Sequence, residues 1–255
     1  MGRFFCYFYQ PNKSWDHTAS VSGYHATMEE FYNFISSHYI LPFYFLVWIA
    51  AMARYRTYFD TPLKFFPIYL MYTFLTELLG YFIKFYDEFQ VVSDNQYDWY
   101  NVIVYNIYSV ITFSFFYYIY WQVVKQKKYK DWIKIGAVVS LSSYIISLFF
   151  QDPFYSNLYY ADLVASMILL WNIYLYFKEI KTESSPYPLK HNLMFWTSLG
   201  LVIFHLIFPF LHIIGYEAPE IWIEYRLRRV LKILILFMYG GFLIGVLVHR
   251  RKAFR

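Results

Sequence analysis

Five ionisable side chains lie inside long apolar segments of the sequence, namely Glu77, Asp162, His205, His212 and Lys232. Such groups are costly in hydrocarbon and by default indicate a functional site. With a helical rise of about 1.5 Å per residue, Glu77 and His205 fall about 13 Å, and Asp162 about 10 Å, below the same end of their segments. We therefore expect these groups to share one layer in one half of a membrane.

This layer predicts a polar pocket that opens outward, away from the cytoplasm. Its expected lining residues are Glu77, Asn106, Asp162, His205 and Lys232, and its expected rim residues are Asn101, His212, Arg228 and Arg229. The two acids face a basic stripe on the last segment, which favours ion pairs that fix helix packing as much as a ligand site. For the rim residues His212, Arg228 and Arg229, snorkelling to the headgroups is the simpler interpretation. The asparagines are typical of interhelical hydrogen bonds.

Two common sequence motifs of catalytic and phosphate-binding sites are missing from the sequence. It contains no His-Glu-x-x-His zinc motif and no Gly-rich phosphate loop. His205 together with Glu77 and Asp162 could ligate a metal, but nothing in their spacing requires one. No catalytic residue is identified, and we predict no metal and no cofactor.

The composition indicates a membrane protein. Of the 255 residues, 59% are hydrophobic, 26% are aromatic and only 15% are charged, against about 25% charged in soluble domains. A hydrocarbon core about 30 Å thick needs about 20 apolar residues per helix. Seven segments meet this length, so we predict an all-α bundle of seven transmembrane helices. They lie near 35–53, 65–86, 99–124, 133–151, 155–177, 191–214 and 227–248.

Basic residues predict the orientation, because Lys and Arg collect in cytoplasmic loops. Fifteen of the 22 Lys and Arg residues fall on one side of the bundle, in the loops after the first, third and fifth segments and after the last. The opposite side collects acids. We therefore predict an N-terminus outside and a cytoplasmic C-terminus. The net charge of +5 is explained by loops that face anionic headgroups, so no nucleic-acid partner is expected.

The predicted domain organisation is simple. Residues 1–34 form an extracytoplasmic tail, 35–249 the transmembrane domain, and 250–255 a basic cytoplasmic tail. Met28 would be a sensible start codon, so residues 1–27 are interpreted as a start-site extension or a disordered tail. The alternative is an extracytoplasmic aromatic flap that lies on the membrane interface. The lone Cys6 excludes an intramolecular disulfide. The Gly241-x-x-x-Gly245 spacing favours close helix packing or a homo-oligomer.

Two stretches carry a family resemblance. Asp60–Phe82, with its Glu-Leu-Leu-Gly, and Trp99–Trp121, with its Tyr-Asn-Ile-Tyr, resemble an uncharacterised family of small seven-helix inner-membrane proteins of Bacteroidota. The resemblance implies the bacterial inner membrane and the fold, and implies no activity. The layout also resembles the membrane sensor modules that precede bacterial histidine kinases.

Three functions are compatible with these features. The first is a sensor or partner-regulating protein, with the outward pocket as its ligand site and a signalling partner held at the loop of Lys125, Lys127, Lys128 and Lys130. The second is a membrane enzyme acting on a lipid or envelope intermediate, with Glu77 or Asp162 as general base. The third is a small transporter. The sensor is the leading interpretation, the enzyme is the alternative and the transporter is a further alternative.

Overall fold

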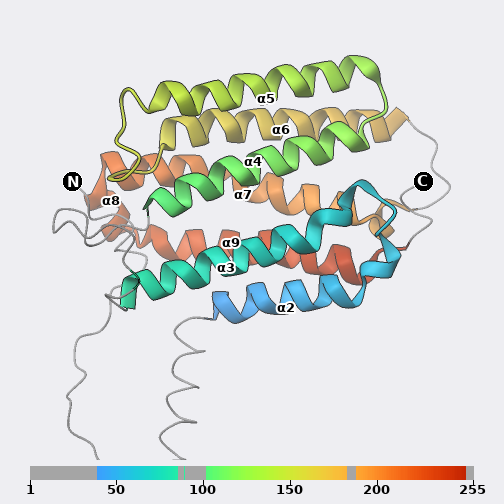
Figure 1. Cartoon of the computed structure of the whole chain (residues 1–255), viewed down its shortest axis with the longest axis horizontal. Helices are drawn as coiled ribbons and strands as arrows, with labels where there is room; N and C mark the ends of the chain where they lie inside the picture. The colour runs from blue at the N-terminus through green and yellow to red at the C-terminus, as the bar shows by residue number, and fades with distance from the viewer. Residues whose placement is uncertain (1–38, 86–88, 90–101, 183–187, 251–255) are drawn as a thin grey trace, which may run out of the picture.

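All regular secondary structure in residues 39–85, 89, 102–182 and 188–250, the residues that this computed structural model describes, is helical. Figure 1 shows the long helices side by side in one bundle. The helices of 14 residues or more are α2 (Ile40–Ala53), α3 (Phe66–Phe85), α4 (Val102–Val123), α5 (Lys127–Ser147), α6 (Tyr159–Thr182), α7 (Leu193–Glu217) and α9 (Leu227–Val248). The shorter ones are η2 (Tyr55–Thr57), η3 (Pro62–Phe65), η5 (Leu189–His191) and α8 (Pro219–Glu224).

Each apolar segment of the sequence corresponds to one of the long helices. The largest error of the prediction is α5, which was expected at 133–151 but runs from Lys127 to Ser147. Its first turns are rich in lysine, which hydropathy excludes from a membrane segment although lysine is a good helix former. The predicted tail 1–34, Asn101 and all of the predicted basic tail 250–255 except Arg250 lie outside the described residues.

Local signals set several helix ends. The Thr61 hydroxyl accepts a hydrogen bond from the Leu63 amide at 3.2 Å, and Pro62 opens η3 with its fixed φ. Asn192 caps α7 by accepting from the Met194 amide at 2.9 Å. Between α8 and α9 the chain turns at Arg226, whose φ of 50° is left-handed. Thr61 and Asn192 thus mark where η3 and α7 begin, and the left-handed Arg226 allows a tight turn between α8 and α9.

α7 occupies a central position, packed on α6 and, most closely, on α9. Small residues bring α7 and α9 together. A Cβ atom added to Gly200 would lie 2.7 Å from the carbonyl oxygen of Met238, and one added to Gly241 would lie 3.0 Å from that of Trp196. The face of α9 formed by Gly241 and Gly245 is therefore covered by α7, which confirms the predicted close helix packing. A second copy of the chain has no room to bind at this face.

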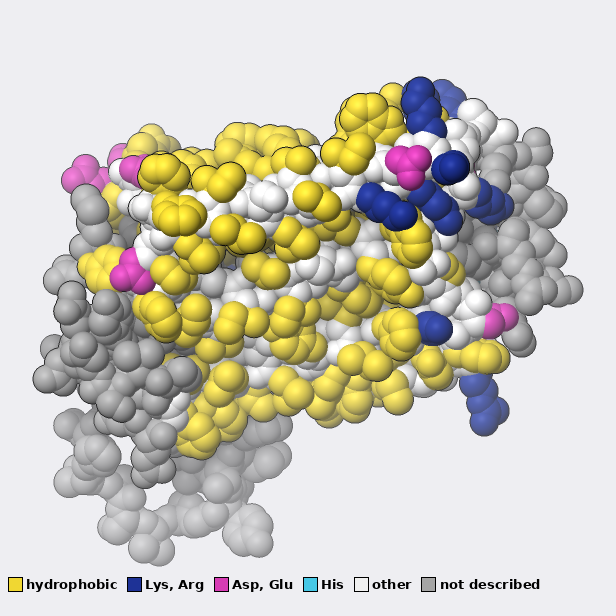
Figure 2. Space-filling model, turned by 45° about the horizontal axis from the view of Figure 1, so that its top comes forward, with side chains coloured by type: hydrophobic (Ala, Val, Ile, Leu, Met, Phe, Trp, Pro, Cys, Tyr) yellow, Lys and Arg dark blue, Asp and Glu magenta, His cyan; other side chains and the backbone are white. Residues whose placement is uncertain are grey.

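The outer surface suits a membrane. Five helices are long and apolar enough to cross one, covering Pro62–Ile83, Val102–Val123, Tyr159–Thr182, Leu193–Glu217 and Leu227–Val248. α2 is apolar but shorter. α5 is not among the five because Lys127–Lys134 carries five charged side chains. Figure 2 shows apolar side chains along the body of the bundle and Lys and Arg gathered at one end.

Candidate functional site

A cavity of about 220 Å³ lies between α2, α3, α4, α7 and α9. Its wall is mainly aromatic and aliphatic, with a few polar groups. α3, α7 and α9 contribute the ionisable side chains among its described lining residues, which are Glu77, His205, His212 and Lys232. An apolar pocket with a few converging polar groups is the usual form of a small-molecule site.

Glu77 and Lys232 line the same cavity without touching each other. The Glu77 carboxylate accepts one hydrogen bond, from the Tyr105 hydroxyl at 3.3 Å. The Lys232 ammonium lies 5.3 Å from the ring centroid of Tyr39. Among the described residues no ion pair joins Glu77 to Lys232, so the expected cross-bundle ion pair between the acids and the α9 stripe is wrong for this acid.

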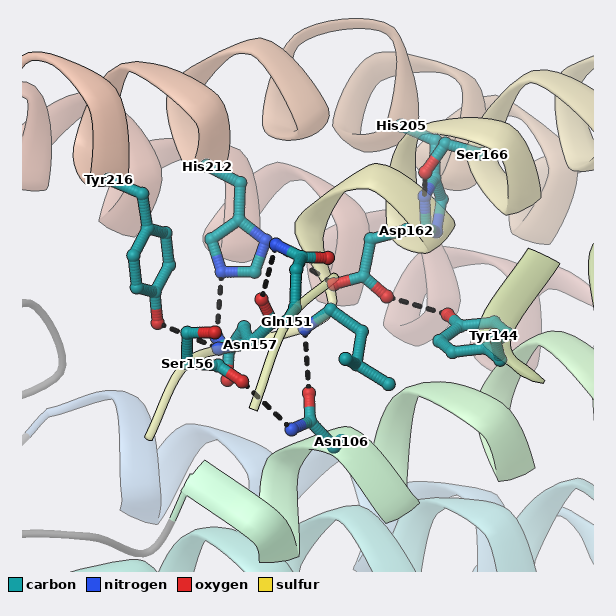
Figure 3. A network of polar contacts seen from close by, with 11 residues as sticks. Asn106, Tyr144, Gln151, Ser156, Asn157, Asp162, Ser166, His205, His212 and Tyr216 are labelled. Atoms are coloured by element: carbon teal, nitrogen blue, oxygen red, sulfur yellow. Dashed lines mark hydrogen bonds and ion pairs between the residues drawn. The ribbon is translucent and has the colours of Figure 1, made fainter. Parts of the chain in front are cut away.

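Asp162 pairs instead with a histidine. It is 1% exposed, and it is not among the lining residues of the cavity. Its Oδ2 lies 3.3 Å from His212 Nδ1, and its Oδ1 accepts from the Tyr144 hydroxyl at 2.6 Å. Figure 3 shows Asp162 between these two side chains. The carboxylate therefore links α5, α6 and α7 behind the cavity wall.

The contacts of His212 assign its tautomer. Its Nε2 lies 2.8 Å from the side-chain nitrogen of Asn157, and an amide nitrogen can only donate. With the amide placed in this way Nε2 accepts, and Nδ1, which faces Asp162, is the ring nitrogen that carries a proton. His212 was expected at the rim, snorkelling to the headgroups. It lies instead in the cavity wall and is 9% exposed, because Asn157 and Asp162 hold it inside.

Asn106 was expected in the pocket but lies in the polar network beside it (Figure 3). Its side-chain amide donates to the carbonyls of Pro153 at 2.8 Å and Ser156 at 3.2 Å. Its oxygen accepts from the Leu158 amide at 3.0 Å. All three bonds go to the backbone before α6. Asn106 thus fixes the α5–α6 connection, consistent with its interpretation as a hydrogen-bonding residue between helices.

His205 lies in the cavity wall, where its Nδ1 is 3.0 Å from the Ser166 hydroxyl. The remaining predicted rim residues are placed in the first turn of α9, with Arg228 half-buried and Arg229 exposed, and neither is among the lining residues. In the part of the chain that the structure describes, no cluster of three or more His, Cys, Asp or Glu side chains could hold a metal ion.

The basic loop lies at the opposite end of the bundle from this site. Lys125, Lys127 and Lys128 are exposed. The Lys130 ammonium lies 5.4 Å from the ring centroid of Trp121. The cavity extends toward this surface as far as Tyr69, in the first turn of α3.

Several contributing residues were missed by the sequence interpretation. Tyr144, Asn157 and Ser166 complete the network, and Ser166 could have been found because it lies one helical turn after Asp162. Glu179 was missed because the fifth segment was ended at residue 177. It is 5% exposed, and its Oε1 accepts from the Lys125 amide at 2.7 Å. Glu179 thus fixes the α4–α5 turn at the basic end.

No family model, curated protein or solved structure matches the chain. The resemblance to a Bacteroidota membrane family therefore stays a prediction.

Proposed function

We propose that the chain is a multi-pass protein of the bacterial inner membrane with seven spanning helices, and that it senses a small molecule bound in the cavity. The inner-membrane location is supported by the resemblance of Asp60–Phe82 and Trp99–Trp121 to the Bacteroidota family. The seventh span is supported by α5, whose side chains Ile135, Val138 and Ile145 are 57%, 65% and 62% exposed. Apolar exposure of this extent suits contact with lipid.

The proposed orientation has the basic end in the cytoplasm and the cavity half outside. The helices α2, α4, α6 and α9 finish at one end of the bundle (Figure 1), which therefore holds Arg54, Lys64, Lys125, Lys190 and Arg250. Single cysteines at Lys128 and Glu220, in a Cys6→Ser background, test this. A membrane-impermeant maleimide added to whole cells should label position 220 alone. Labelling of position 128 alone would reverse the orientation.

The observation that carries the ligand proposal is that Glu77 and Lys232 line one cavity and form no ion pair with each other. Charged groups in a membrane interior are usually paired or face a functional cavity. Here an acid and a base face the same space, so a bound molecule can contact both. A structural salt bridge would need the two side chains in contact, and they are not.

Native mass spectrometry of the protein purified from its host membranes tests ligand binding. Ile235 lines the cavity, and Ile235→Trp would fill part of it. We expect a bound molecule on the wild type that the Ile235→Trp protein loses. The exposed Ile233, two residues earlier on α9, supplies the matched control Ile233→Trp, which should keep the molecule. Identical spectra for all three proteins would contradict a ligand site here.

Sensing requires that occupancy of the cavity changes the basic surface. A fluorophore on Lys128→Cys, in the Cys6→Ser background, would report this when the molecule identified by mass spectrometry is added. A change that Ile235→Trp abolishes supports a sensor with a cytoplasmic partner. Uptake of that molecule into sealed vesicles without such a change would favour a transporter instead.

A membrane enzyme is the second candidate, and the Asp162–His212 pair favours it. A histidine that lies beside a carboxylate can act as a general base, because the carboxylate stabilises the ring once it is protonated. His212 also lies in the cavity wall. Chemical conversion of the molecule found in the cavity, lost in His212→Gln, would favour the enzyme. Release of that molecule unchanged after prolonged incubation would favour the sensor.

A further inference from the structure

Tyrosines form much of the cavity wall on the side of Glu77. Tyr44, Tyr69, Tyr105, Tyr108 and Tyr239 come from α2, α3, α4 and α9. The rings of Tyr44 and Tyr239 lie 4.4 Å apart, and the hydroxyls of Tyr69 and Tyr108 lie 3.4 Å apart. Of the five, Tyr105 contacts the Glu77 carboxylate, and aromatic rings in one wall with a carboxylate attract ammonium groups by charge and by cation–π contact.

Two hydroxyls in this wall, those of Thr112 and Tyr239, form no hydrogen bond with the described residues. The Tyr239 side chain is 1% exposed, and Thr73 lies near its hydroxyl without the geometry of a hydrogen bond. A buried hydroxyl without a partner destabilises the protein, so such groups usually have a partner in the functional state. Because Tyr239 lines the cavity, a polar group of a bound molecule can supply that partner.

The opposite charge lies nearer the end of the bundle. Lys232 is five residues from the start of α9, whereas Glu77 is eight residues from the end of α3. At about 1.5 Å per residue these positions are about 8 Å and about 12 Å from the ends of their helices. No carboxylate of the described residues lies within salt-bridge distance of Lys232. An anionic group that enters beside Lys232 would thus lie closer to the end than one beside Glu77.

The cavity size limits the bound group. A volume of about 220 Å³ is below the roughly 300–1,000 Å³ of sites for drug-sized ligands. It suits a small molecule or the headgroup of a larger amphiphile.

We propose that the cavity recognises a zwitterionic group, with its ammonium between Glu77 and the tyrosines and its phosphate or carboxylate beside Lys232. Both charges of the cavity are then paired at once, which neither an amine nor an acid alone achieves. The zwitterionic group is either the headgroup of a lipid or a free small molecule, and both would present the same ammonium and anionic groups to the cavity. The inference rests on the proposed ligand-binding function and specifies the ligand class.

Thermal unfolding of the full chain in an uncharged maltoside detergent, followed by tryptophan fluorescence, tests this. Four probes are titrated: lysophosphatidylethanolamine as zwitterion, lysophosphatidylglycerol as anion, dodecylamine as cation, and O-phosphoethanolamine as a zwitterion without a chain. We expect lysophosphatidylethanolamine to raise the melting temperature with a half-saturating concentration at least about tenfold lower than those of the singly charged amphiphiles. A response to O-phosphoethanolamine as well identifies a free molecule as the source, and a response to the lysolipid alone identifies a headgroup.

Variants separate the two charges. Glu77→Gln should remove the advantage of lysophosphatidylethanolamine over lysophosphatidylglycerol, and Lys232→Met its advantage over dodecylamine. The matched controls Glu224→Gln and Arg229→Met make the same charge changes at the same end of the bundle, on exposed residues outside the cavity wall. They should keep both advantages. Conversely, losses of the same size in the controls would assign the selectivity to the charge of the bundle end.

Equal half-saturating concentrations for the three amphiphiles would overturn the zwitterion proposal. The general ligand proposal has its own readout, the mass-spectrometric comparison of the wild type with Ile235→Trp, and can survive that result. If the mass spectra also show no molecule that depends on the cavity, both proposals fail.

Discussion

His212 Nδ1 lies 3.3 Å from Asp162 Oδ2 and connects α7 to α6 at a buried carboxylate. The other carboxylate oxygen receives the Tyr144 hydroxyl at 2.6 Å, so one side chain joins three helices. Glu77, the second acid of the same half, receives one longer hydrogen bond and faces a cavity. The two intramembrane acids therefore occupy different environments, and we expect opposite consequences when each is neutralised.

Asp162→Asn should destabilise the protein by about 2–4 kcal/mol, because the amide leaves His212 and Tyr144 with a weaker partner in a buried site. Chemical unfolding in a fixed detergent measures the change. Tyr144→Phe should cost less, since it removes one hydrogen bond, and the double variant should show coupling between the sites. Additive losses would mean that Asp162 and Tyr144 act independently.

Glu77→Gln should leave the melting temperature unchanged or raise it. The carboxylate has a single hydrogen bond, from Tyr105, and groups kept for function are often neutral or stabilising when replaced. The same unfolding measurement in the absence of added ligand tests this. A loss as large as that of Asp162→Asn would assign Glu77 to the structural network and contradict the ligand site.

Gly200→Ala should destabilise the α7–α9 interface by about 1–3 kcal/mol, because the new methyl group would lie 2.7 Å from a backbone oxygen that cannot rotate away. Gly240→Ala is the matched control. A Cβ atom at Gly240 meets nothing within 4 Å, so this change should be neutral or slightly stabilising in a helix. Equal effects of the two substitutions would place the close contact elsewhere.

His249, just beyond the end of α9, connects three parts of the chain at the basic end. It is 1% exposed; its Nδ1 accepts from the Leu193 amide at 3.2 Å, and its Nε2 donates to the Thr57 carbonyl at 3.2 Å. Both bonds require the neutral ring. Burial lowers the pKa of His249 below its ordinary value of 6.5, and the nearby Arg54 acts in the same direction.

Stability should therefore fall as the pH drops below about 6.5, the ordinary histidine value. In that window the unfolded chain binds a proton on His249 and the folded chain does not, so each step to lower pH favours unfolding. Above it the contribution of His249 is complete. The measurement is the free energy of unfolding between pH 5 and pH 8, for the wild type and His249→Gln. The wild type should show the steeper decline, and parallel curves would exclude His249 as the source.

Hydropathy located the helices well, because an apolar run of helical length stays apolar whatever packs against it. It failed at α5, where five charged residues begin a helix that the apolar count starts later. For the site, counting depth along each helix predicted that Glu77, His205 and Lys232 line one pocket, and all three line the cavity. The count could not separate Asp162 and Asn106 from that cavity, since depth contains no information on which way a side chain points.

The sequence by itself determined the helical class, the helix order, the basic end of the bundle and the layer of polar groups, since these follow from composition and from rise per residue. Only the tertiary structure decided which side chains contact one another. Asn157 and Asp162 hold His212 inside the wall, Tyr144 takes the second oxygen of Asp162, and Glu77 and Lys232 stay apart across a cavity. Hydrogen bonds and ion pairs depend on ångström distances between side chains of different helices, and these distances exist only after the helices have packed.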